Sequence, residues 1–333
     1  MKNKKNLSKK DLNDWKEYLN NPKDLIDKDI QNNPTNRNKR RFTFDLHGYS
    51  LIEANKKVDE IVNFCSQKKY SEILLITGKG IHSKSDNVYE SKDYSKLRYS
   101  VPEYLKTNEE IKKIKFICSI ASDAYNALPS TLSIGNTERE AVHKLKMDIL
   151  NRGADSVPFM PGISGQGGVP QIVCGPTDRI LDDGDILFID TGSTFDGYFC
   201  DFDRNYAFGK VTSDVEKVYH VLWQATEVGI KTAIPGATTN DIFNAMNKII
   251  QDNGAIGNNV GRLGHGLGLQ LTEPPSHRSG DKTIIKENMV LTIEPAMEYA
   301  PGKMLVHEEN IIIQKDGAEL ITKRAPQEIP VIK

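Results

Sequence analysis

Cysteine, long apolar runs and net charge are all scarce in this sequence, and each scarcity excludes a class of protein. The 333 residues carry a net charge of −1 and include four cysteines with no CxxC pair: Cys65, Cys118, Cys174 and Cys200. Such scattered cysteines predict reduced thiols in a cytoplasmic protein and not a disulfide framework. No apolar run approaches the roughly 20 residues of a membrane-spanning helix, so no membrane partner is expected.

The beginning of the chain lacks the apolar segment of a secretory signal. Its first residues, "MKNKKNLSKKDLNDWKEYL", are basic and polar, and residues 1–40 are rich in Lys, Arg and Asn. This composition predicts a flexible basic arm. Over the whole chain, 38% of the residues are hydrophobic and 27% are charged, as expected of a globular protein.

Residues 41–106 alternate between strand and helix patterns. "RFTFDLHGYS" and "SEILLITGKG" have the composition of strands, and the segment between them has apolar residues at helical spacing. This strand–helix–strand order predicts two parallel strands. A second helix is expected at Ser95–Leu105, with Pro102 near its first turn. The sequence therefore predicts a small α/β module.

Residues 107–333 show one pattern twice. Two amphipathic helices, the first beginning near Asn108, precede strands expected around Gln171–Cys174, Ile186–Asp190 and Phe199–Asp203. Two further amphipathic helices and a second set of strands follow. The order of two helices, strands, two helices and strands predicts an internal pseudo-repeat in an α+β domain.

Carboxylates occupy strand positions of this domain that would otherwise be apolar. In "DTGSTFDGYFCDFDR", a hairpin that turns near Phe195–Gly197 would place Asp190 opposite Asp201, with Asp203 on the same face. Directly opposed residues have Cβ atoms about 4.5–5.5 Å apart. Two bare carboxylates at that separation repel each other, and a divalent cation between them removes the repulsion. The pair is therefore predicted to bind metal.

Three further residues complete a candidate metal site. His265 lies between glycines in "LGHGLGL", Glu294 lies in the apolar run "LTIEPAM", and Glu308 precedes the apolar run of "LVHEENIII". Oxygen ligands with one imidazole suit Mn, Fe, Co or Zn. Four carboxylates exceed the needs of one divalent ion. They fit two ions about 3.5–4 Å apart that share bridging carboxylates.

These motifs resemble the signatures of the pita-bread metallohydrolases, which include methionine aminopeptidase, Xaa-Pro aminopeptidase, prolidase and the metal-free creatinase. The resemblance covers about residues 108–333 and rests on "DTGSTFDGYFCDFDR", "GHGLGL", "TIEPAMEY" and "HEEN". It implies a pita-bread catalytic domain that holds two divalent ions. Asp190 would chelate one ion, and Asp201 and Glu308 would bridge the pair. His265 and Glu294 would complete the shell of the other ion.

The resemblance also implies a mechanism. Water between the ions ionises near neutral pH, and the metal-bound hydroxide attacks an amide or peptide carbonyl. Glu294 would be the general base, and His265 would be the other catalytic residue. The implied protein is a cytoplasmic Xaa-Pro aminopeptidase or prolidase that cleaves small peptides with manganese or a similar metal. A homodimer is compatible with this interpretation.

Two departures from the family pattern concern the substrate pocket. Peptide-cleaving relatives carry histidines at the positions that align with Val173 and Thr272, where they bind the substrate and help stabilise the tetrahedral intermediate. His277 and His307 are nearby in sequence and could replace them. The changed pocket also leaves open a second hypothesis, an enzyme of the same fold that hydrolyses or cleaves a small non-peptide solute.

The preceding module resembles the Smr domain, the small MutS-related module. "FDLHGYS", "LLITGKG" and "LRYSVPEYL" carry the resemblance over residues 41–106, and the module is expected to be truncated after Leu105. Nucleic-acid binding is implied, with Asp45, His47 and Lys79 at the polar motif positions. A Gly-Lys-Gly turn can present N–H groups and a cation to a phosphate, and the basic arm would add phosphate affinity. A third hypothesis is therefore a nucleic-acid-binding protein with a vestigial hydrolase half.

Overall fold

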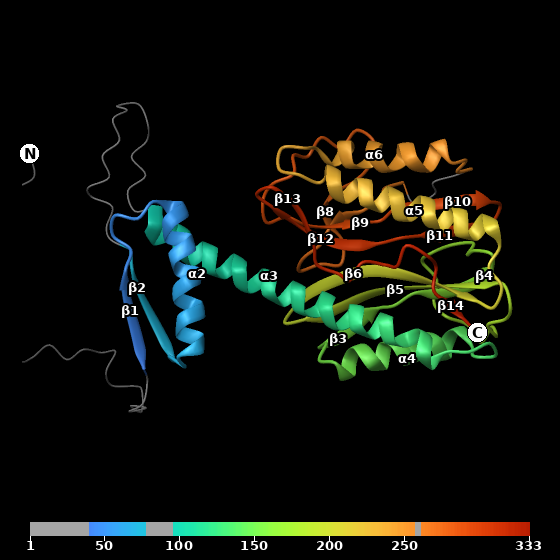
Figure 1. The fold of residues 1–333 in the computed structure, drawn as a ribbon, viewed down its shortest axis with the longest axis horizontal. Helices are drawn as coiled ribbons and strands as arrows, with labels where there is room; N and C mark the ends of the chain where they lie inside the picture. The colour runs from blue at the N-terminus through green and yellow to red at the C-terminus, as the bar shows by residue number, and fades with distance from the viewer. Residues whose placement is uncertain (1–39, 78–95, 257–260) are drawn as a thin grey trace, which may run out of the picture. The chain divides into compact units, whose positions relative to one another are not determined.

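The computed structural model describes residues 40–77, 96–256 and 261–333. The chain forms two units, Met1–Pro102 and Glu103–Lys333, which we describe separately (Figure 1). Residues 1–39 of the predicted basic arm, and Lys79, lie outside the described residues. Within the described ranges, no helix has the length and apolar character needed to cross a membrane.

The first unit contains a parallel strand pair connected by one helix. β1 (Arg41–Asp45) pairs in parallel with β2 (Glu72–Ile76), and α2 (Leu51–Gln67) connects them, which confirms the predicted strand–helix–strand order. Ser50 begins α2 with a capping box: its hydroxyl accepts a hydrogen bond from the N–H of Glu53, whose carboxylate accepts one from the N–H of Ser50. The buried residues of α2 recur at helical spacing and form one face: Ala54, Val58, Ile61 and Cys65.

The helix after this unit differs from the prediction. The sequence predicts separate helices on either side of Lys106, whereas the structure has one continuous helix, α3 (Lys96–Ala127), with Pro102 in its interior. Proline lacks the N–H group of an interior helical residue and often ends a helix. The segment 105–108 contains neither glycine nor a second proline, so no local signal ends the helix between the two apolar patterns.

The second unit has two sheets between two layers of helices (Figure 1). One sheet has the strand order β14-β6-β5-β3 with β4 beside β5, the other has the order β13-β12-β9-β7-β8, and β10 pairs with β11. The helices besides α3 are a 3-10 turn (Leu128–Thr131), α4 (Glu138–Asn151), α5 (Ser213–Thr232) and α6 (Thr239–Asp252). The strands are β3 (Ser156–Phe159), β4 (Gly162–Gln166), β5 (Asp185–Phe195), β6 (Tyr198–Phe208), β7 (His265–Gly266), β8 (Glu273–Ser276), β9 (Val290–Ile293), β10 (Ala296–Ala300), β11 (Lys303–Val306), β12 (Glu309–Gln314), β13 (Gly317–Leu320) and β14 (Val331–Ile332).

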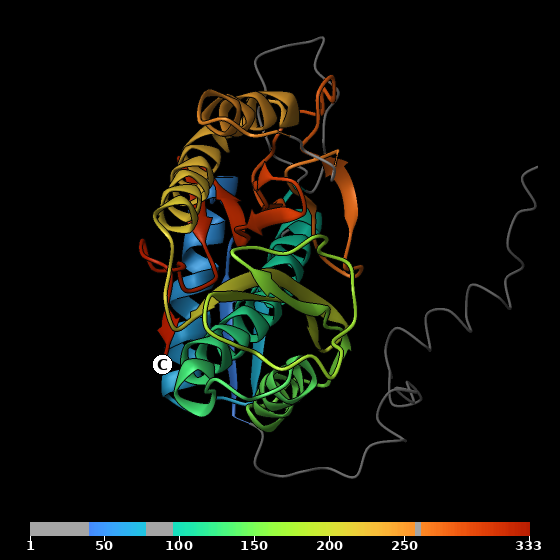
Figure 2. The same ribbon diagram turned by 90° about the vertical axis from the view of Figure 1, so that its right-hand side faces the viewer.

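Each sheet buries one face against its own pair of helices. α3 and α4 cover the sheet with β5 and β6, and α5 and α6 cover the sheet with β9 and β12; Figure 2 shows the same layers after a quarter turn. Leu145 and Phe202 are among the residues that fill the first interface, and Leu222 and Ile311 are among those that fill the second. This arrangement confirms the predicted α+β fold with its repeated pattern of two helices and strands.

The hairpin of β5 and β6 turns at Asp196–Gly197. Phe195 faces Tyr198 across the turn, and the two central residues have positive φ angles of 47° and 83°. A two-residue hairpin turn of this kind requires positive φ at both central positions. Glycine adopts such angles freely and aspartate tolerates them, whereas a bulky aromatic residue such as Phe195 does not. The turn therefore lies slightly later than the sequence analysis places it.

The later turn changes the register of the hairpin. The predicted pairing of Asp190 with Asp201 is wrong, because Asp190 faces Asp203 and Asp201 faces Gly192. Side chains alternate between the two faces of a strand, and the register differs from the prediction by two residues. The three aspartates therefore still share one face of the sheet, as the sequence analysis expects.

Two other strand predictions are corrected by the structure. Gln171–Cys174 is irregular, although the carbonyl of Cys174 accepts a hydrogen bond of 3.0 Å from the N–H of Gly162. In the glycine-rich segment around His265, the strand β7 is only two residues long. Glycine disfavours long regular strands, which accounts for the second difference.

Candidate metal centre

Three aspartates lie on the inner face of the β5–β6 hairpin, opposite the face that packs against the helices. Asp201 and Asp203 are 4% and 2% exposed, and Asp190 is half-buried. Burial, with the negative charge of neighbouring carboxylates, raises the pKa of all three well above the ordinary value. Three acids in one buried patch therefore require protons or a cation.

His265 on β7 lies against this patch. Its Nε2 atom is 3.3 Å from Oδ2 of Asp201, and its Nδ1 atom is 2.8 Å from the carbonyl oxygen of Gly266. A carbonyl only accepts hydrogen bonds, so Nδ1 carries the proton and Nε2 has a free lone pair. Burial lowers the pKa of His265, which favours the neutral imidazole that binds metals.

A glycine fixes the backbone beside this histidine. Gly264 has a φ of +130°, and a Cβ atom there would lie 2.3 Å from the carbonyl oxygen of Thr292 and 2.6 Å from Cδ2 of His277. The hydroxyl of Thr292 accepts a hydrogen bond of 3.1 Å from the N–H of His265. The absence of a side chain at position 264 therefore allows His265 to approach β9 closely.

Two glutamates approach from the second sheet. Glu308 immediately precedes β12 and is 2% exposed, and its Oε1 atom has no hydrogen-bond partner among the described residues. Ligand atoms of Asp201, His265 and Glu308 all lie within 4.8 Å of one another. Glu294 immediately follows β9, where its N–H donates to the carbonyl of Leu263 at 3.0 Å. Burial raises the pKa of the Glu294 carboxyl to about 7.

The donor set fits a divalent metal centre. Carboxylate oxygens and one imidazole nitrogen together suit Mn, Fe, Co or Zn. Both oxygens of Asp203 and Oε1 of Glu308 lack a hydrogen-bond partner among the described residues. A cation would satisfy these acceptors, because a buried carboxylate without a partner costs several kcal/mol. The structure thus brings together, from both sheets, the side chains that the sequence analysis selected as ligands: Asp190, Asp201, His265, Glu294 and Glu308.

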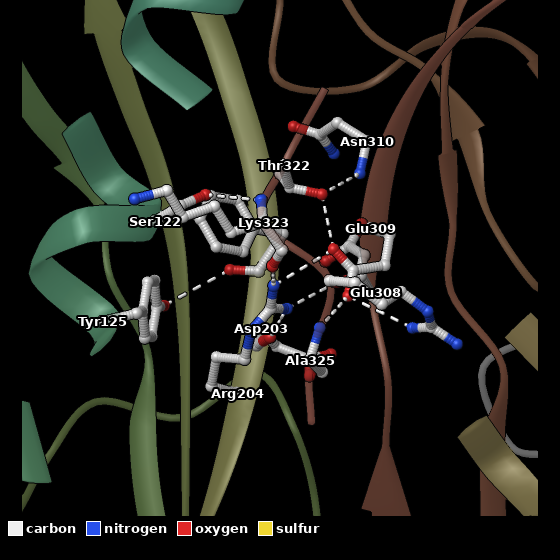
Figure 3. A network of polar contacts seen from close by, with 12 residues as sticks. Ser122, Tyr125, Asp203, Arg204, Glu308, Glu309, Asn310, Thr322, Lys323 and Ala325 are labelled. Atoms are coloured by element: carbon white, nitrogen blue, oxygen red, sulfur yellow. Dashed lines mark hydrogen bonds and ion pairs between the residues drawn. The ribbon is translucent and has the colours of Figure 1, made fainter. Parts of the chain in front are cut away.

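A buried ion pair beside these acids was not predicted from the sequence. Nη2 of Arg204 lies 3.0 Å from Oε2 of Glu309, with side chains 8% and 0% exposed (Figure 3). Nη1 of Arg204 also donates to the carbonyls of Asp203 and Glu308, at 2.6 and 2.9 Å. The only sequence signal for this ion pair is that Arg204 follows an acid in "CDFDR" and Glu309 follows an acid in "HEEN". A local pattern does not show that these two residues meet. The ion pair fixes the backbone next to two acids of the cluster.

A second cation, Arg262, lies at the edge of the cluster and was also missed. Its positive charge lowers the pKa of Asp201, Glu294 and His265, although burial is the largest influence on each. Its Nη2 atom is 3.4 Å from the hydroxyl of Thr272. Arg262 is half-buried. It therefore presents a guanidinium group beside the candidate metal ligands.

The four residues predicted to line a substrate pocket fall into an exposed and a buried pair. Val173 is 72% exposed, and Thr272 is also exposed. His277 and His307 are 0% and 2% exposed, and their ring nitrogens have no hydrogen-bond partner among the described residues. The ring of His307 packs edge-on against Tyr219, with centroids 4.3 Å apart. Contact of these four with a substrate stays a prediction.

In the first unit, two of the predicted nucleic-acid residues lie side by side. Asp45 ends β1, and its Oδ1 atom accepts a hydrogen bond of 2.9 Å from the N–H of His47 and contacts Nδ1 of the same residue. The backbone hydrogen bond lowers the pKa of Asp45. Both side chains are more than half exposed. The end of β1 therefore presents an accessible carboxylate–imidazole pair.

Comparisons with known proteins agree with this geometry. The model of metallopeptidase family M24 matches residues 112–315, and the model of the Smr domain matches residues 44–117. An Xaa-Pro dipeptidase of Pyrococcus furiosus is 30% identical over 277 residues, which cover 80% of this chain and 78% of the relative. An Xaa-Pro dipeptidase of Pyrococcus horikoshii is 30% identical over 223 residues, covering 66% of this chain and 62% of the relative.

Solved structures are similar as well. A dipeptidase PepE from Mycobacterium ulcerans matches with a TM-score of 0.64 at 27% identity, covering 70% of this chain and 64% of that one. A prolidase from Pyrococcus furiosus matches with a TM-score of 0.62 at 25% identity, covering 86% and 78%. These matches confirm both family resemblances and the fold class that the sequence predicts.

Proposed function

The chain belongs to metallopeptidase family M24 and is a metallohydrolase, and on that premise we propose that it is an Xaa-Pro dipeptidase or aminopeptidase with two divalent metal ions. The observation that carries the proposal is the convergence of Asp201, His265 and Glu308, whose ligand atoms lie within 4.8 Å of one another. Metallopeptidases of this family use divalent metals. The relatives named Xaa-Pro dipeptidase favour a peptide substrate over the small-solute hypothesis.

The residues of the centre have distinct tasks in this proposal. Asp190 and Asp201 reach it from the first sheet, and Glu308 reaches it from the second, so the ligand set is complete only when the two sheets pack together. Divalent ions held there would supply Lewis acidity toward a carbonyl oxygen and lower the pKa of water. The hydrogen bond from Nδ1 of His265 to Gly266 holds the imidazole in the tautomer that a metal ligand needs.

Glu294 is the general base in this proposal. Burial raises its pKa to about 7, so its carboxylate can accept a proton and release it again near neutral pH. During amide hydrolysis, the proton from the attacking water would pass to Glu294 and then to the leaving amine. Glu294 is half-buried, and its carboxylate interacts electrostatically with Asp190 and His265 of the cluster.

Arg262 offers a partner for the charged end of a small peptide. Val173 and Thr272 stand where peptide-cleaving relatives have histidines, so this chain needs another group to bind the substrate. The guanidinium of Arg262 lies close enough to Thr272 for a hydrogen bond and acts electrostatically on Glu294. A guanidinium group binds a carboxylate well. We therefore assign Arg262 the role of binding the substrate's carboxylate.

The test is turnover of a panel of Xaa-Pro dipeptides, tripeptides and peptides without proline. Purified protein is reconstituted separately with Mn, Co, Fe and Zn, and the bound metal is quantified in each sample. Metal-dependent cleavage confined to the Xaa-Pro peptides is the expected result. Two bound ions without cleavage of any peptide would contradict the proposal and favour the small-solute hypothesis instead.

Nucleic-acid binding is a second candidate function, favoured by the Smr match at residues 44–117. The exposed Asp45–His47 pair of the first unit and the lysine- and arginine-rich residues 1–40 would provide the contacts. Phosphate contacts made by basic residues weaken as salt rises, because binding releases counterions from the nucleic acid. The full chain should therefore bind a single-stranded RNA or a DNA duplex less tightly at higher salt.

This second function is tested with fluorescently labelled oligonucleotides and the full-length protein. Deletion of residues 1–40 is expected to flatten the dependence of log K on log salt, and His47→Ala is expected to weaken binding. Exchange of the exposed His143 on α4 for Gln is the control and should leave binding unchanged. Absence of binding at low salt would rule this function out and leave the peptidase proposal untouched.

A further inference from the structure

Asp203 is a buried acid that the proposed reaction does not use. It is 2% exposed, and neither of its carboxylate oxygens has a hydrogen-bond partner among the described residues. Most buried polar atoms in proteins are hydrogen-bonded, and an unpaired buried carboxylate is strongly destabilising. A proton or a bound cation must therefore compensate this side chain in the folded protein.

The nearest cation, Arg204, acts on this carboxylate through its charge but gives it no hydrogen bond. Both terminal nitrogens of Arg204 are committed to other acceptors: Nη1 donates to the backbone carbonyls of Asp203 and Glu308, and Nη2 donates to the carboxylate of Glu309 and the carbonyl of Lys323. Figure 3 shows Arg204 among these residues. The Asp203 carboxylate is thus left out of the ion-pair network, although its backbone takes part.

The position of Asp203 places it at one end of the acidic cluster. It lies directly opposite Asp190 across the hairpin and on the same face as Asp201. Asp190 is the largest electrostatic influence on it after burial. The imidazole of His265 lies instead against Asp201. The cluster therefore has one end with a nitrogen donor and another end, at Asp190 and Asp203, with oxygen donors alone.

We propose that Asp203 is an additional ligand of the metal centre, paired with Asp190, and that this oxygen-only end takes a hard divalent cation such as Mn²⁺. The inference rests on the proposed two-metal function. Oxygen-only donor sets suit Mn²⁺, Mg²⁺ and Ca²⁺, whereas an imidazole donor is shared by Zn²⁺, Fe²⁺ and Co²⁺. The two ends of the centre therefore differ in metal preference, and Asp203 sets the preference of the end without histidine.

The test compares wild-type protein with Asp203→Asn in the metal-free and Mn²⁺-loaded forms. Asparagine keeps the shape of the side chain and removes the charge. The metal-free variant should melt at a temperature higher by about 3 °C or more, because the fold no longer has to bury an unpartnered acid, whether by protonating it or by holding its charge. Calorimetric titration should show one of two Mn²⁺ sites weakened at least about 10-fold. Metal analysis after desalting should fall from about two ions per chain to about one.

Asp185→Asn is the matched control, since it makes the same change at another buried aspartate. Asp185 begins β5, and both of its oxygens accept hydrogen bonds, from Arg179, Gln166 and the N–H of Asp182. This variant should melt at a lower temperature without metal and bind Mn²⁺ as wild type does. Asp203→Ser is a second variant at the proposed ligand and should show the same loss of one Mn²⁺ site.

The outcomes separate this proposal from the proposed function. Wild-type protein that binds no divalent cation would overturn both. If wild type binds two Mn²⁺ ions and both Asp203 variants bind two with unchanged affinity, the role of Asp203 is refuted and the metal centre stands. A metal-free Asp203→Asn protein that is less stable and binds Mn²⁺ normally would show a structural acid and would also refute the proposal.

Discussion

The guanidinium of Arg204 and the carboxylate of Glu309 form an ion pair of 3.0 Å between β6 and β12, with both side chains buried (Figure 3). The pair lies between the two sheets that supply the candidate metal ligands. It is flanked in the sequence by Asp203 on one side and Glu308 on the other. The Glu309 carboxylate also accepts hydrogen bonds from the hydroxyl of Thr322, the guanidinium of Arg324 and the N–H of Ala325.

Removing one partner of this pair should strongly destabilise the second unit. Glu309→Gln leaves the buried Arg204 without its counter-charge, so the free energy of unfolding should fall by about 3–5 kcal/mol. Denaturant unfolding of the metal-free protein measures the change. Glu319→Gln, which breaks a half-exposed pair with Lys115, is the control and should cost about 1 kcal/mol or less. Equal effects of the two changes would show that burial of the Arg204–Glu309 pair adds nothing.

Replacement of Glu294 by Gln should abolish turnover and spare folding. The amide cannot accept the proton that we assign to this carboxylate, so kcat should fall by about 10²–10⁴. Circular dichroism and bound-metal analysis establish whether the variant is folded and loaded. Glu287→Gln, an exposed change seven residues earlier, should keep full activity. A substantial kcat in a folded, metal-loaded Glu294→Gln protein would contradict the assignment of Glu294 as the general base.

Replacement of Arg262 by Gln should weaken substrate binding more than catalysis. Loss of the guanidinium removes an attraction present in both ground and transition states, so KM for a dipeptide should rise about 10-fold with kcat little changed. A dipeptide amide has no carboxylate, and its KM should be the same for both proteins. An equal rise in KM for dipeptide and amide would argue against carboxylate recognition by Arg262.

The stability of the metal-free protein should depend on pH through His277. Burial lowers the pKa of this side chain to about 4, against about 6.5 in the unfolded chain. Between these values the unfolded state binds more protons, so stability is lost as pH falls from 6.5 toward 4, by about 3 kcal/mol in total. His277→Leu lacks this contribution and should have a flatter profile.

The His277 prediction depends on the difference between two stability profiles, because other groups titrate in the same range. Denaturant unfolding of wild type and His277→Leu is measured from pH 7.5 to 4 without metal. The exposed His143 on α4 provides a control variant, His143→Gln, whose profile should follow that of wild type. Parallel profiles for wild type and His277→Leu would mean that His277 is protonated as easily in the fold as outside it.

Local sequence patterns predict most of the helices and strands and the residue types of the candidate centre, although Gln171–Cys174 is not a strand and α3 is one helix where two are expected. Apolar spacing specifies α2 and the helices of the second unit, because helical periodicity is a local property. The strand pairing of β1 and β2 follows from the order of their patterns, as the structure bears out. Acids at strand positions near Asp190 and Asp201 indicate a cation because buried charge must be neutralised. These conclusions need only neighbouring residues and the chemistry of their side chains.

Which side chains meet depends on the packing of the whole second unit. The turn angles at Asp196–Gly197 set the register that places Asp203, and not Asp201, opposite Asp190. Packing of the two sheets pairs Arg204 with Glu309, which are 105 residues apart in the sequence. Such contacts depend on the fit of distant elements, and a local pattern contains no information about that fit. The sequence therefore selects the candidate donors, and the packing of the sheets decides which of them lie close together.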